Sequence, residues 1–468
     1  SPDRGTRTTA DPRNANQGSS VAVPWHVVAF LVPTERETSM IRWLFAGLLT
    51  TVWVNNIPAA DVPATESRTI LTETGVKGGL VVHVGCGDGR LTAALRANEA
   101  YRVHGLDTKT ENVAAARRHI QSLGLYGPVS VETWEGSSLP YADNLVNLVV
   151  AEKLDRCSME EVLRVLAPLG AAYVRTADGW RKTVKPWPRE MGQWTHYRQG
   201  PGNNPVTPDT LVGPPRGLQW SCNPLWVRSH AFTTSFTAMV SARGRVFYIL
   251  DDAPTGIAQD AVPEQWTLIA RDAFNGVLLW KQSLSPWGVA AWKNRALRYS
   301  PKAGEDCLVA HKDRVMMTLG YQSAVSILDA ATGRTLGVCE GTDGALELRC
   351  ENDILVVNRA GESLMAFDAR DARPLWNVDT RIFNMVINSE RVMYFDQTVK
   401  ALVCLRLEDG TSAWQNAAVP PKSIMTHGDY VVLGPDLQVL SVETGKVLWT
   451  KKMTERIPGN KMFVYQDK

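Results

Sequence analysis

The stretch that most constrains this chain is a run of apolar residues that leads directly into three closely spaced glycines. Residues 80–90 read Leu-Val-Val-His-Val-Gly-Cys-Gly-Asp-Gly-Arg, and a helix-like Leu-Thr-Ala-Ala-Leu-Arg follows. Such an apolar run predicts a buried parallel strand. Glycine permits backbone angles that a Cβ forbids, and it lets a ligand come close to the main chain. The sequence therefore predicts a strand, a glycine turn and a helix start that together cradle a small molecule.

The spacing of these glycines differs from that of a dinucleotide-binding loop. A dinucleotide fingerprint needs Gly or Ala three residues after its second glycine, and this chain has Arg90 there. The glycines at positions 85, 87 and 89 instead follow a Gly-x-Gly-x-Gly pattern.

Strands and helices are predicted to alternate after the glycine turn, which is typical of a parallel sheet. The second strand ends at Asp107, and the helix after it stops at a glycine. The predicted ranges are a strand at 101–106, a helix at 111–124, strands at 129–133 and 145–151, a helix at 159–167 and a strand at 171–174.

In order and spacing, these elements resemble class I S-adenosylmethionine-dependent methyltransferases over about residues 66–176. The resemblance implies a Rossmann-like domain at 65–177 and S-adenosylmethionine as its cofactor. The glycine loop would approach the methionine part of this donor, Asp107 the ribose, and Trp134 and Glu135 the adenine. The residues implied to bind the donor are Gly85, Gly87, Asp88, Gly89, Asp107, Trp134 and Glu135. No catalytic base can be named.

Two positions depart from the pattern of this family. His83 stands where an acidic residue usually precedes the first glycine by two positions, and Asn147 stands where Asp often opens the fourth strand. We expect both changes to remove negative charge near a cationic sulfonium ligand.

Composition excludes some classes of function. With 50 basic and 48 acidic residues, the chain has no basic field that would suggest nucleic acid. Its seven cysteines are scattered without a Cys-x-x-Cys pair, so neither a zinc site nor a disulfide framework is indicated. We expect no metal site.

The first part of the chain suggests a segment that directs export. Residues 1–20 are polar and without period, and we expect the whole upstream segment 1–39 to be disordered. Residues 40–64 combine a short basic start, an apolar run and small residues, which is typical of a secretory signal. The alternatives are a membrane anchor or a buried helix. We expect a periplasmic or cell-surface protein, with membrane contact only through 40–64, or a cytoplasmic protein if this segment is not a signal.

Residues 178–215 are rich in Pro, Gly and Trp and predict an ordered connector. Flexible linkers have few large apolar groups. We therefore expect the aromatic rings around this segment to pack against the neighbouring domains. The rings are those of Trp180, Trp187, Trp194, Tyr197 and Trp220.

A repeated frame dominates the remainder of the chain. Each copy reads as strand, turn and strand, with a glycine or its substitute at the turn and mostly a terminal Trp that we expect to be buried at the seam between sheets. The spacing of the copies is the length of a four-stranded propeller blade. The copies lie at 268–280, 326–337, 365–376, 404–414 and 440–449.

This frame resembles the propeller of pyrroloquinoline-quinone (PQQ)-type quinoproteins, over roughly residues 216–468. About five blades can be counted, and residues 461–465 resemble the first strand of another, so we expect the sequence to stop inside a larger propeller. Enzymes of that family use adjacent cysteines against the quinone, and no two cysteines here are adjacent. We therefore do not expect PQQ as a cofactor.

Three functions remain open. In the first, a methyltransferase-like domain acts beside a propeller that binds the substrate or a partner. In the second, an exported adaptor without catalysis uses its propeller to bind a protein or a glycan. The third is a quinoprotein dehydrogenase, which the cysteine pattern disfavours. The methyl acceptor is not indicated by any motif.

Overall fold

A computed structural model describes most of the chain after residue 61. The described residues are 62–154, 157–213, 217–223, 235–255, 263–288, 291, 302–360, 362–417, 421–453 and 462–465. The predicted disordered segment and all but the last three residues of the predicted signal lie outside them. Those three residues, Val62 to Ala64, begin a helix. Within the described residues, no helix is long and apolar enough to cross a membrane.

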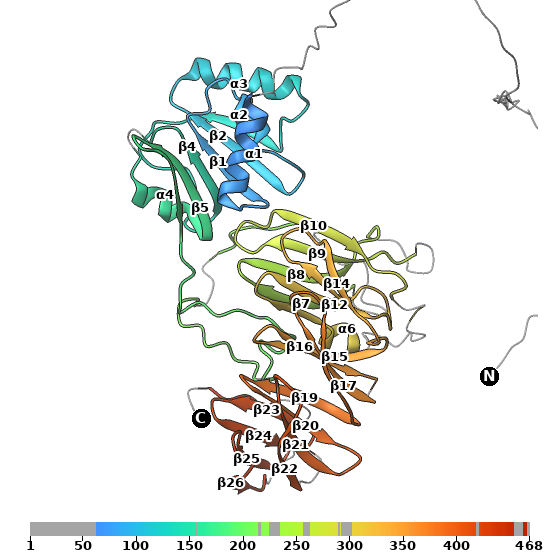
Figure 1. Cartoon of the computed structure of the whole chain (residues 1–468). Coiled ribbons are helices and arrows are strands. Elements are labelled where there is room, and N and C mark those ends of the chain that lie inside the picture. Colours follow the sequence, from blue (N-terminus) through green and yellow to red (C-terminus); the bar gives the residue numbers. More distant parts are fainter. Residues whose placement is uncertain are drawn as a thin grey trace, which may run out of the picture. The chain divides into compact units, whose positions relative to one another are not determined.

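The N-terminal domain is a six-stranded sheet with helices on both faces (Figure 1). Its strand order is β3-β2-β1-β4-β5-β6, with five parallel strands and an antiparallel β6. This arrangement confirms the predicted Rossmann-like fold. The strands are β1 (Gly79–Val84), β2 (Tyr101–Asp107), β3 (Val129–Thr133), β4 (Val146–Ala151), β5 (Leu166–Thr176) and β6 (Gly179–Val184). The helices are α1 (Val62–Thr74), α2 (Arg90–Ala94), α3 (Thr110–Ser122) and α4 (Met159–Val165).

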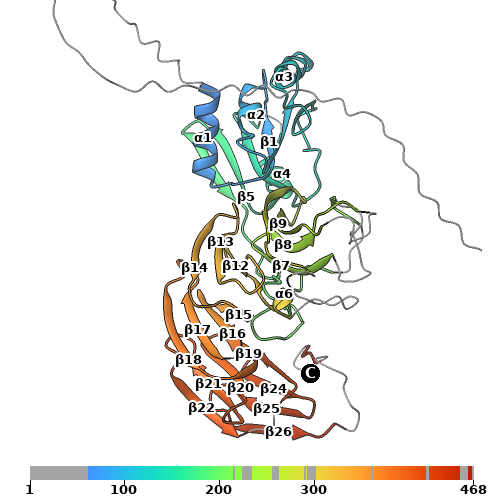
Figure 2. The same cartoon turned by 90° about the vertical axis from the view of Figure 1, so that its right-hand side faces the viewer.

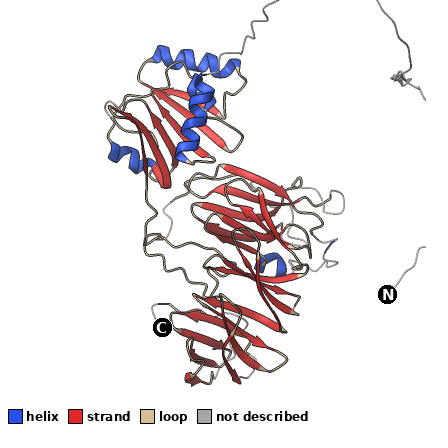
Figure 3. Ribbon diagram, in the orientation of Figure 1, coloured by secondary structure: helices blue, strands red, loops and turns tan. Residues whose placement is uncertain are grey.

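Two apolar layers hold this sheet between its helices, because successive side chains of a strand point to opposite faces. On one face, Val81 and Leu148 pack in a cluster with residues of α1, α2 and α3. On the other face, Val82 and Val149 pack with residues of α4. Figure 3 shows the helices on either side of the strands. Burial on both faces explains why these strands are nearly continuous apolar runs.

The last strand of this sheet was not foreseen, because its residues fall at the start of the predicted connector. Gly179, with φ of 110°, lets the chain turn back after β5, and β6 then pairs with β5 in antiparallel register. Trp180 stacks on Tyr173 with ring centroids 4.9 Å apart. The aromatic residue that suggested a connector is thus a packing residue of the sheet.

Five four-stranded antiparallel sheets follow, and they form a β-propeller arrangement (Figure 2). The first two sheets comprise β7 (Phe236–Ala242), β8 (Arg245–Asp251), β9 (Trp266–Asp272), β10 (Leu278–Ser283), β11 (Leu308–His311), β12 (Arg314–Thr318), β13 (Val325–Asp329) and β14 (Thr335–Cys339). The next two comprise β15 (Ala345–Glu351), β16 (Ile354–Arg359), β17 (Ser363–Asp368), β18 (Pro374–Asp379), β19 (Ile382–Asn388), β20 (Arg391–Asp396), β21 (Ala401–Arg406) and β22 (Ser412–Ala417). The fifth comprises β23 (Ser423–His427), β24 (Tyr430–Gly434), β25 (Leu437–Ser441) and β26 (Val447–Lys451). A short helix, α6 (Lys302–Asp306), precedes β11.

The first strand of each sheet is the innermost strand of the propeller. Strands β7, β11, β15, β19 and β23 contact one another in sequence, and each lies at one edge of its own sheet. The predicted frames form the last two strands of each sheet, on the side away from these contacts.

The turns of the frames have the backbone conformation that the sequence predicted. The residue at the turn has a positive φ in all five sheets, including Ala372, which replaces glycine at 63°. The four glycines are Gly276 (72°), Gly333 (72°), Gly410 (68°) and Gly445 (67°). Positive φ is easily adopted by glycine and strained for alanine.

Each of these four glycines also lies against a tryptophan of the preceding sheet or segment. A Cβ on the glycine would come within 2.4 to 2.7 Å of the indole ring. The indole N–H donates to a carbonyl three residues before the glycine. The hydrogen bonds run from Trp220 to Ala273 (2.9 Å), Trp280 to Ala330 (3.1 Å), Trp376 to Leu407 (2.8 Å) and Trp414 to Val442 (2.8 Å). The tryptophans therefore lie at the seams, as predicted, although the terminal residues Trp280, Trp376 and Trp414 are partly rather than fully buried.

Two positions break the pattern of the seams. At one seam, Gly337 takes the place of the Trp and Ala372 takes the place of the turn glycine. A Cβ on Gly337 would lie 2.8 Å from the Cβ of Ala372, so the two replacements occur at positions that face each other. The expectation that Trp449 is buried is wrong, since this side chain is 50% exposed. Trp449 lies on β26 of the fifth sheet, and within the described ranges no turn glycine of a following sheet lies against it.

The connector crosses the first strands of all five sheets. Its backbone and one side chain receive hydrogen bonds from one residue of each strand. The backbone amides of Ser241, Ala310, Ile387 and Thr426 donate to the carbonyl oxygens of Trp194, Thr195, Pro201 and Gly202, in that order. The amide of Cys350 donates to the Nε2 of His196. Two rings expected to pack, Trp194 and Tyr197, stay 37% and 40% exposed. The backbone rather than these rings holds the connector in place.

Candidate functional site

The glycine loop at the end of β1 leaves space beside its main chain. Gly85 and Gly87 have φ of 79° and 53°, and a Cβ built on either would meet no heavy atom within 4 Å. The loop is tied to β2 because the amides of Gly85 and Cys86 both donate to the carbonyl of Leu106, at 2.8 and 3.0 Å. The loop is thus fixed in position while the space on its glycine side remains open to a ligand.

Gly89 serves packing rather than a ligand. It precedes α2 with φ of 81°, and a Cβ there would lie 2.7 Å from the Cβ of Ala116 on α3. This glycine is required for the close approach of α2 and α3. Of the three predicted loop glycines, only the first two face open space.

Asp107 is brought next to the glycine loop by the parallel pairing of β1 and β2. Its carboxylate accepts hydrogen bonds from the amide of Gly87 (3.0 Å) and from the amide of Lys109 (2.9 Å). The side-chain amide of Asn112 donates to both carboxylate oxygens at 3.1 Å. The side chain is buried, with an exposed fraction of 7%. Asp107 therefore joins the loop, the strand end and the first turn of α3.

Asn112 is a partner of Asp107 that sequence reasoning missed. Its position five residues after Asp107, in the first turn of the following helix, was a usable signal, because that turn lies beside the end of β2. A carboxylate offers about four acceptor positions, and three donor groups already occupy Asp107. Two of these acceptor contacts come from the side-chain amide of Asn112.

The remaining predicted residues lie around the same edge of the sheet. Trp134 follows β3, and its backbone amide donates to the carbonyl of Asp107 at 2.9 Å, while its indole N–H donates to Ser138. Glu135 is exposed beside it. Asp88 is also exposed and pairs with Arg90 at 3.1 Å. The structure therefore gathers the predicted residues at the carboxyl edge of β1, β2 and β3, which is where open α/β sheets bind ligands.

His83 lies under the glycine loop and carries no charge at neutral pH. Its ring is 3% exposed, and Nδ1 is 2.8 Å from the hydroxyl of Thr92 on α2. Burial lowers the pKa of His83 to about 4, against the opposing effect of nearby Asp107. Cys86, beside it, is equally buried, and burial raises the pKa of its thiol to about 12. Both side chains are packing residues of the loop.

Asn147 lies at the opposite edge of the sheet, so the expectation that it affects the charge near a sulfonium is wrong. It is the second residue of β4, and its Oδ1 accepts from the amide of Leu80 at the start of β1 (2.8 Å). Parallel strands place their starts at one edge and the glycine turn at the other. The side chain of Asn147 therefore points away from the loop.

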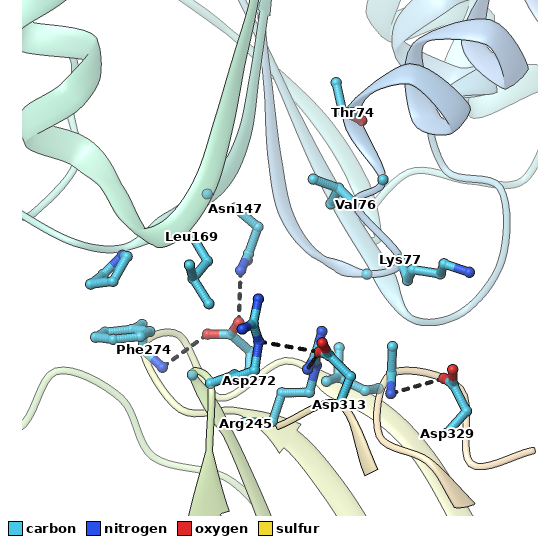
Figure 4. Close-up of a pocket in the computed structure, with 18 residues that line it drawn as sticks. Thr74, Val76, Lys77, Asn147, Leu169, Arg245, Asp272, Phe274, Asp313 and Asp329 are labelled. Atoms are coloured by element: carbon cyan, nitrogen blue, oxygen red, sulfur yellow. Dashed lines mark hydrogen bonds and ion pairs between the residues drawn. The ribbon is translucent and has the colours of Figure 1, made fainter. Parts of the chain in front are cut away.

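The amide of Asn147 instead binds the turn of the first propeller sheet (Figure 4). Its Nδ2 donates to Asp272 at 2.7 Å, and Asn275 donates to Asn147 Oδ1 at 2.7 Å and to the carbonyl of Leu145 at 2.9 Å. Asp272 is 5% exposed, and burial raises the pKa of its carboxyl despite the hydrogen bond from Asn147. Asn147 is thus a docking residue between the parallel sheet and the propeller.

A cavity of about 360 Å³ surrounds this contact. Charged residues of both signs line it, among them Lys77, Arg245 and Asp313 (Figure 4). Its buried carboxyl, Asp272, has both oxygens hydrogen-bonded, since the amide of Phe274 also donates to it at 2.9 Å. Arg245 and Asp313 pair at 3.0 Å. The buried carboxyl of Asp272 and the Arg245–Asp313 pair thus already have hydrogen-bond partners within the protein. We interpret the cavity as a polar junction and not as a ligand site.

The part of the chain that the structure describes contains no candidate metal site. There, no group of three or more His, Cys, Asp or Glu side chains could hold a metal ion. His196 is 1% exposed, and its Nε2 accepts from the amide of Cys350 at 3.1 Å. It serves to hold the connector against β15.

Two family models match the chain. The model of a methyltransferase domain matches residues 81–170. The model described as outer membrane protein assembly factor BamB matches residues 223–418 and 322–466. The search of the curated proteins finds no match.

Solved structures resemble each part separately. A Methanococcus maripaludis protein proposed to be an S-adenosyl-L-methionine-dependent methyltransferase is 21% identical, with a TM-score of 0.22, and the match covers 24% of this chain and 53% of that one. A SAM-dependent methyltransferase from Aquifex aeolicus is 26% identical, with a TM-score of 0.21 and coverages of 23% and 62%. BamB from Moraxella catarrhalis is 14% identical, with a TM-score of 0.27 and coverages of 47% and 74%. The chain thus spans about half the length of the first of these proteins.

Proposed function

Starting from the fact that the chain belongs, through residues 223–466, to the family described as outer membrane protein assembly factor BamB, we propose that it joins a donor-binding methyltransferase-like domain to a partner-binding propeller. The donor is S-adenosylmethionine, which the methyltransferase domain at 81–170 makes the expected cofactor. The substrate or partner of the propeller is a protein or a glycan.

The observation that carries the donor proposal is the open glycine loop attached to Asp107. Gly85 and Gly87 face open space, and the Gly87 amide donates to the Asp107 carboxylate. A ligand lying along the loop would meet bare main chain first and then an acceptor-only carboxylate, which suits a hydroxyl-bearing nucleoside. The residues present therefore fit the donor.

The chain's own residues would bind and orient the donor. S-adenosylmethionine supplies an already activated methyl group when bound, so the protein has mainly to align the acceptor and exclude water. Asp107 would accept the ribose hydroxyls as Asn112 turns away, and Trp134 with Glu135 would border the adenine. The loop glycines and Asp88 would lie along the methionine part.

Calorimetric titration of the full chain with S-adenosylmethionine tests this proposal. We expect the wild type to bind and Asp107→Ala to lose about 1.5 to 3 kcal/mol, roughly 10- to 150-fold in affinity, because a charge-assisted hydrogen bond is removed. Asp371→Ala is the matched control, since Asp371 is an exposed turn residue of the propeller. Equal binding by Asp107→Ala and the wild type would contradict the assigned role.

The second candidate is an adaptor without catalysis in the cell envelope. It is favoured by membership of the BamB family and by the neutral, buried His83 where methyltransferases usually carry an acid. If the protein is such an adaptor, we expect the folded wild type to show no heat of binding with S-adenosylmethionine. We also expect cell fractionation to find the protein with the envelope. A cytoplasmic protein that binds the donor would exclude it.

A further inference from the structure

A second cavity, of about 270 Å³, lies among the innermost strands of the propeller, apart from the glycine loop. Strands β15, β19 and β23 line it together with the end of α6 and the connector. Its volume is close to the lower end of ordinary ligand pockets, which begin at about 300 Å³. Its lining is almost entirely polar: Arg198, Asp306, Glu347, Arg349, Asn384 and Ser423 belong to it.

Arg349 is the central side chain of this cavity, and it is only partly satisfied. It is 2% exposed, and its Nη2 donates to Glu347 at 2.7 Å and to Asn203 at 2.8 Å. Within the described residues, its buried Nε–H has no hydrogen-bond acceptor. Four other arginines in the described ranges share an unpartnered Nε, and none of them lines this cavity. A buried donor without an acceptor costs about 1 to 3 kcal/mol, so a ligand that supplies an acceptor here is favoured.

The charges of the lining restrict what can bind. Glu347 is 1% exposed, pairs with Arg349 and accepts from the amide of Met385 at 3.3 Å, and the carboxylate of Asp306 also lies 3.8 Å from Arg349 Nη2. Glu305 and Asp306 add two carboxylates to the same cavity, and Arg198 adds one cation. The lining therefore carries one excess negative charge, which disfavours an anionic ligand.

Hydroxyl groups fit between these side chains better than other ligand groups. Carboxylates only accept hydrogen bonds and guanidinium groups only donate them, whereas a hydroxyl does both. A hydroxyl can accept from Arg349 Nε while it donates to a neighbouring carboxylate. Amides such as that of Asn384 can likewise pair with one hydroxyl as donor and with another as acceptor. Several hydroxyls on a rigid ring meet these requirements together.

We propose that this cavity binds a neutral sugar unit, with the Nε of Arg349 donating to a ring hydroxyl and the carboxylates of Asp306 and Glu305 accepting from hydroxyls. The sugar can be free or the end of a glycan chain. The site gives the partner-binding propeller a specific ligand class, and it is independent of donor binding at the glycine loop.

Saturation-transfer NMR on the full chain tests this site, with glucose, galactose, mannose and N-acetylglucosamine as separate probes at about 10 mM. A small neutral ligand with a few hydrogen bonds is expected to have a Kd near 1 mM, or about 4 kcal/mol. We expect transfer to at least one of these sugars in the wild type. Arg349→Lys, which keeps the charge beside Glu347 but removes the Nε–H, should lose the transfer at least tenfold, and so should Asn384→Ala.

Arg391→Lys is the matched control, because Arg391 also has an unpartnered Nε but lies outside the cavity. It should bind like the wild type. Thermal unfolding of every variant shows that the loss does not reflect an unfolded propeller. Binding of none of the four sugars by the wild type, or equal binding by Arg349→Lys, would overturn the proposal. Binding of the zwitterion glycine in place of a sugar would overturn it too.

Discussion

The two edges of the parallel sheet are built from similar residues but have different surroundings. At the carboxyl edge, Gly85 and Gly87 lie beside open space, and the Gly87 amide donates to buried Asp107. At the opposite edge, Asn147 is covered by the turn of the first propeller sheet and is hydrogen-bonded to Asp272. The difference is that one edge leaves room beside its main chain while the other is joined to the propeller. The role of a polar residue near a strand end can therefore be assigned only when it is known at which edge of the sheet the residue lies.

We expect the largest effect on stability from alanine substitutions at two glycines of the same loop, which should differ in their cost. Both Gly87 and Gly89 have a positive φ, but only Gly89 is packed against Ala116. Gly89→Ala adds a steric overlap to backbone strain and should lower the free energy of unfolding by about 2 to 5 kcal/mol. Gly87→Ala should cost only the strain, about 1 to 2 kcal/mol. Urea denaturation measures both. Equal losses would show that Gly87 is packed rather than open.

The second effect concerns pH and the buried His83. Its pKa is about 4 when folded and about 6.5 when unfolded, so the unfolded chain binds more protons between these values and stability falls as pH drops from 6.5 to 4. His83 should contribute on the order of 3 kcal/mol to this loss. His83→Gln, which keeps a partner for Thr92, should flatten that part of the pH profile. An identical profile in the variant would contradict the neutral, buried state.

A third variant, Asn147→Asp, tests the covered edge. The new carboxylate keeps both acceptor contacts but loses the donor to Asp272 and places a second acid beside it. We expect a loss of about 2 to 3 kcal/mol at pH 7 in thermal or urea unfolding. Because the pKa of buried Asp272 is raised, protonation of the pair should restore stability as pH falls toward 4.

Asn144→Asp is the control for that variant. Asn144 accepts from the ammonium group of Lys185 at 2.7 Å, so a carboxylate there should be neutral or stabilising. If both variants were equally destabilised, the covered edge would have no special role. If neither were, Asn147 would not hold the propeller.

The features that the sequence predicted correctly are those that depend on residues close together along the chain. The glycine loop, Asp107 and the helix start lie within one strand–turn–helix unit and its neighbour, so spacing alone indicated them. The repeated frame likewise predicted the turns, and even the strained Ala372, because each blade repeats the same local requirement. Strand β6 was missed because its tryptophan suggested a connector, although a turn glycine preceded it.

Contacts between distant segments could not be predicted in the same way. Asn147 and Asp272 are 125 residues apart, and nothing near either residue signals the other. Arg349 meets Asn203 across 146 residues, and its cavity combines five separate segments of the chain. Trp449 was expected to be buried because its frame is complete, but burial depends on a neighbouring turn that the frame does not contain.

Hydrogen–deuterium exchange of the full chain, with and without S-adenosylmethionine, tests most directly that the two edges have separate roles. We expect the donor to slow exchange at the glycine loop, at Asp107 to Asn112 and around Trp134, while the amides around Asn147 and in the turn at Asp272 stay unchanged. Slower exchange at Asn147 and Asp272 without a change at the loop would contradict the account, and so would a donor-bound protein with no protection at Asp107.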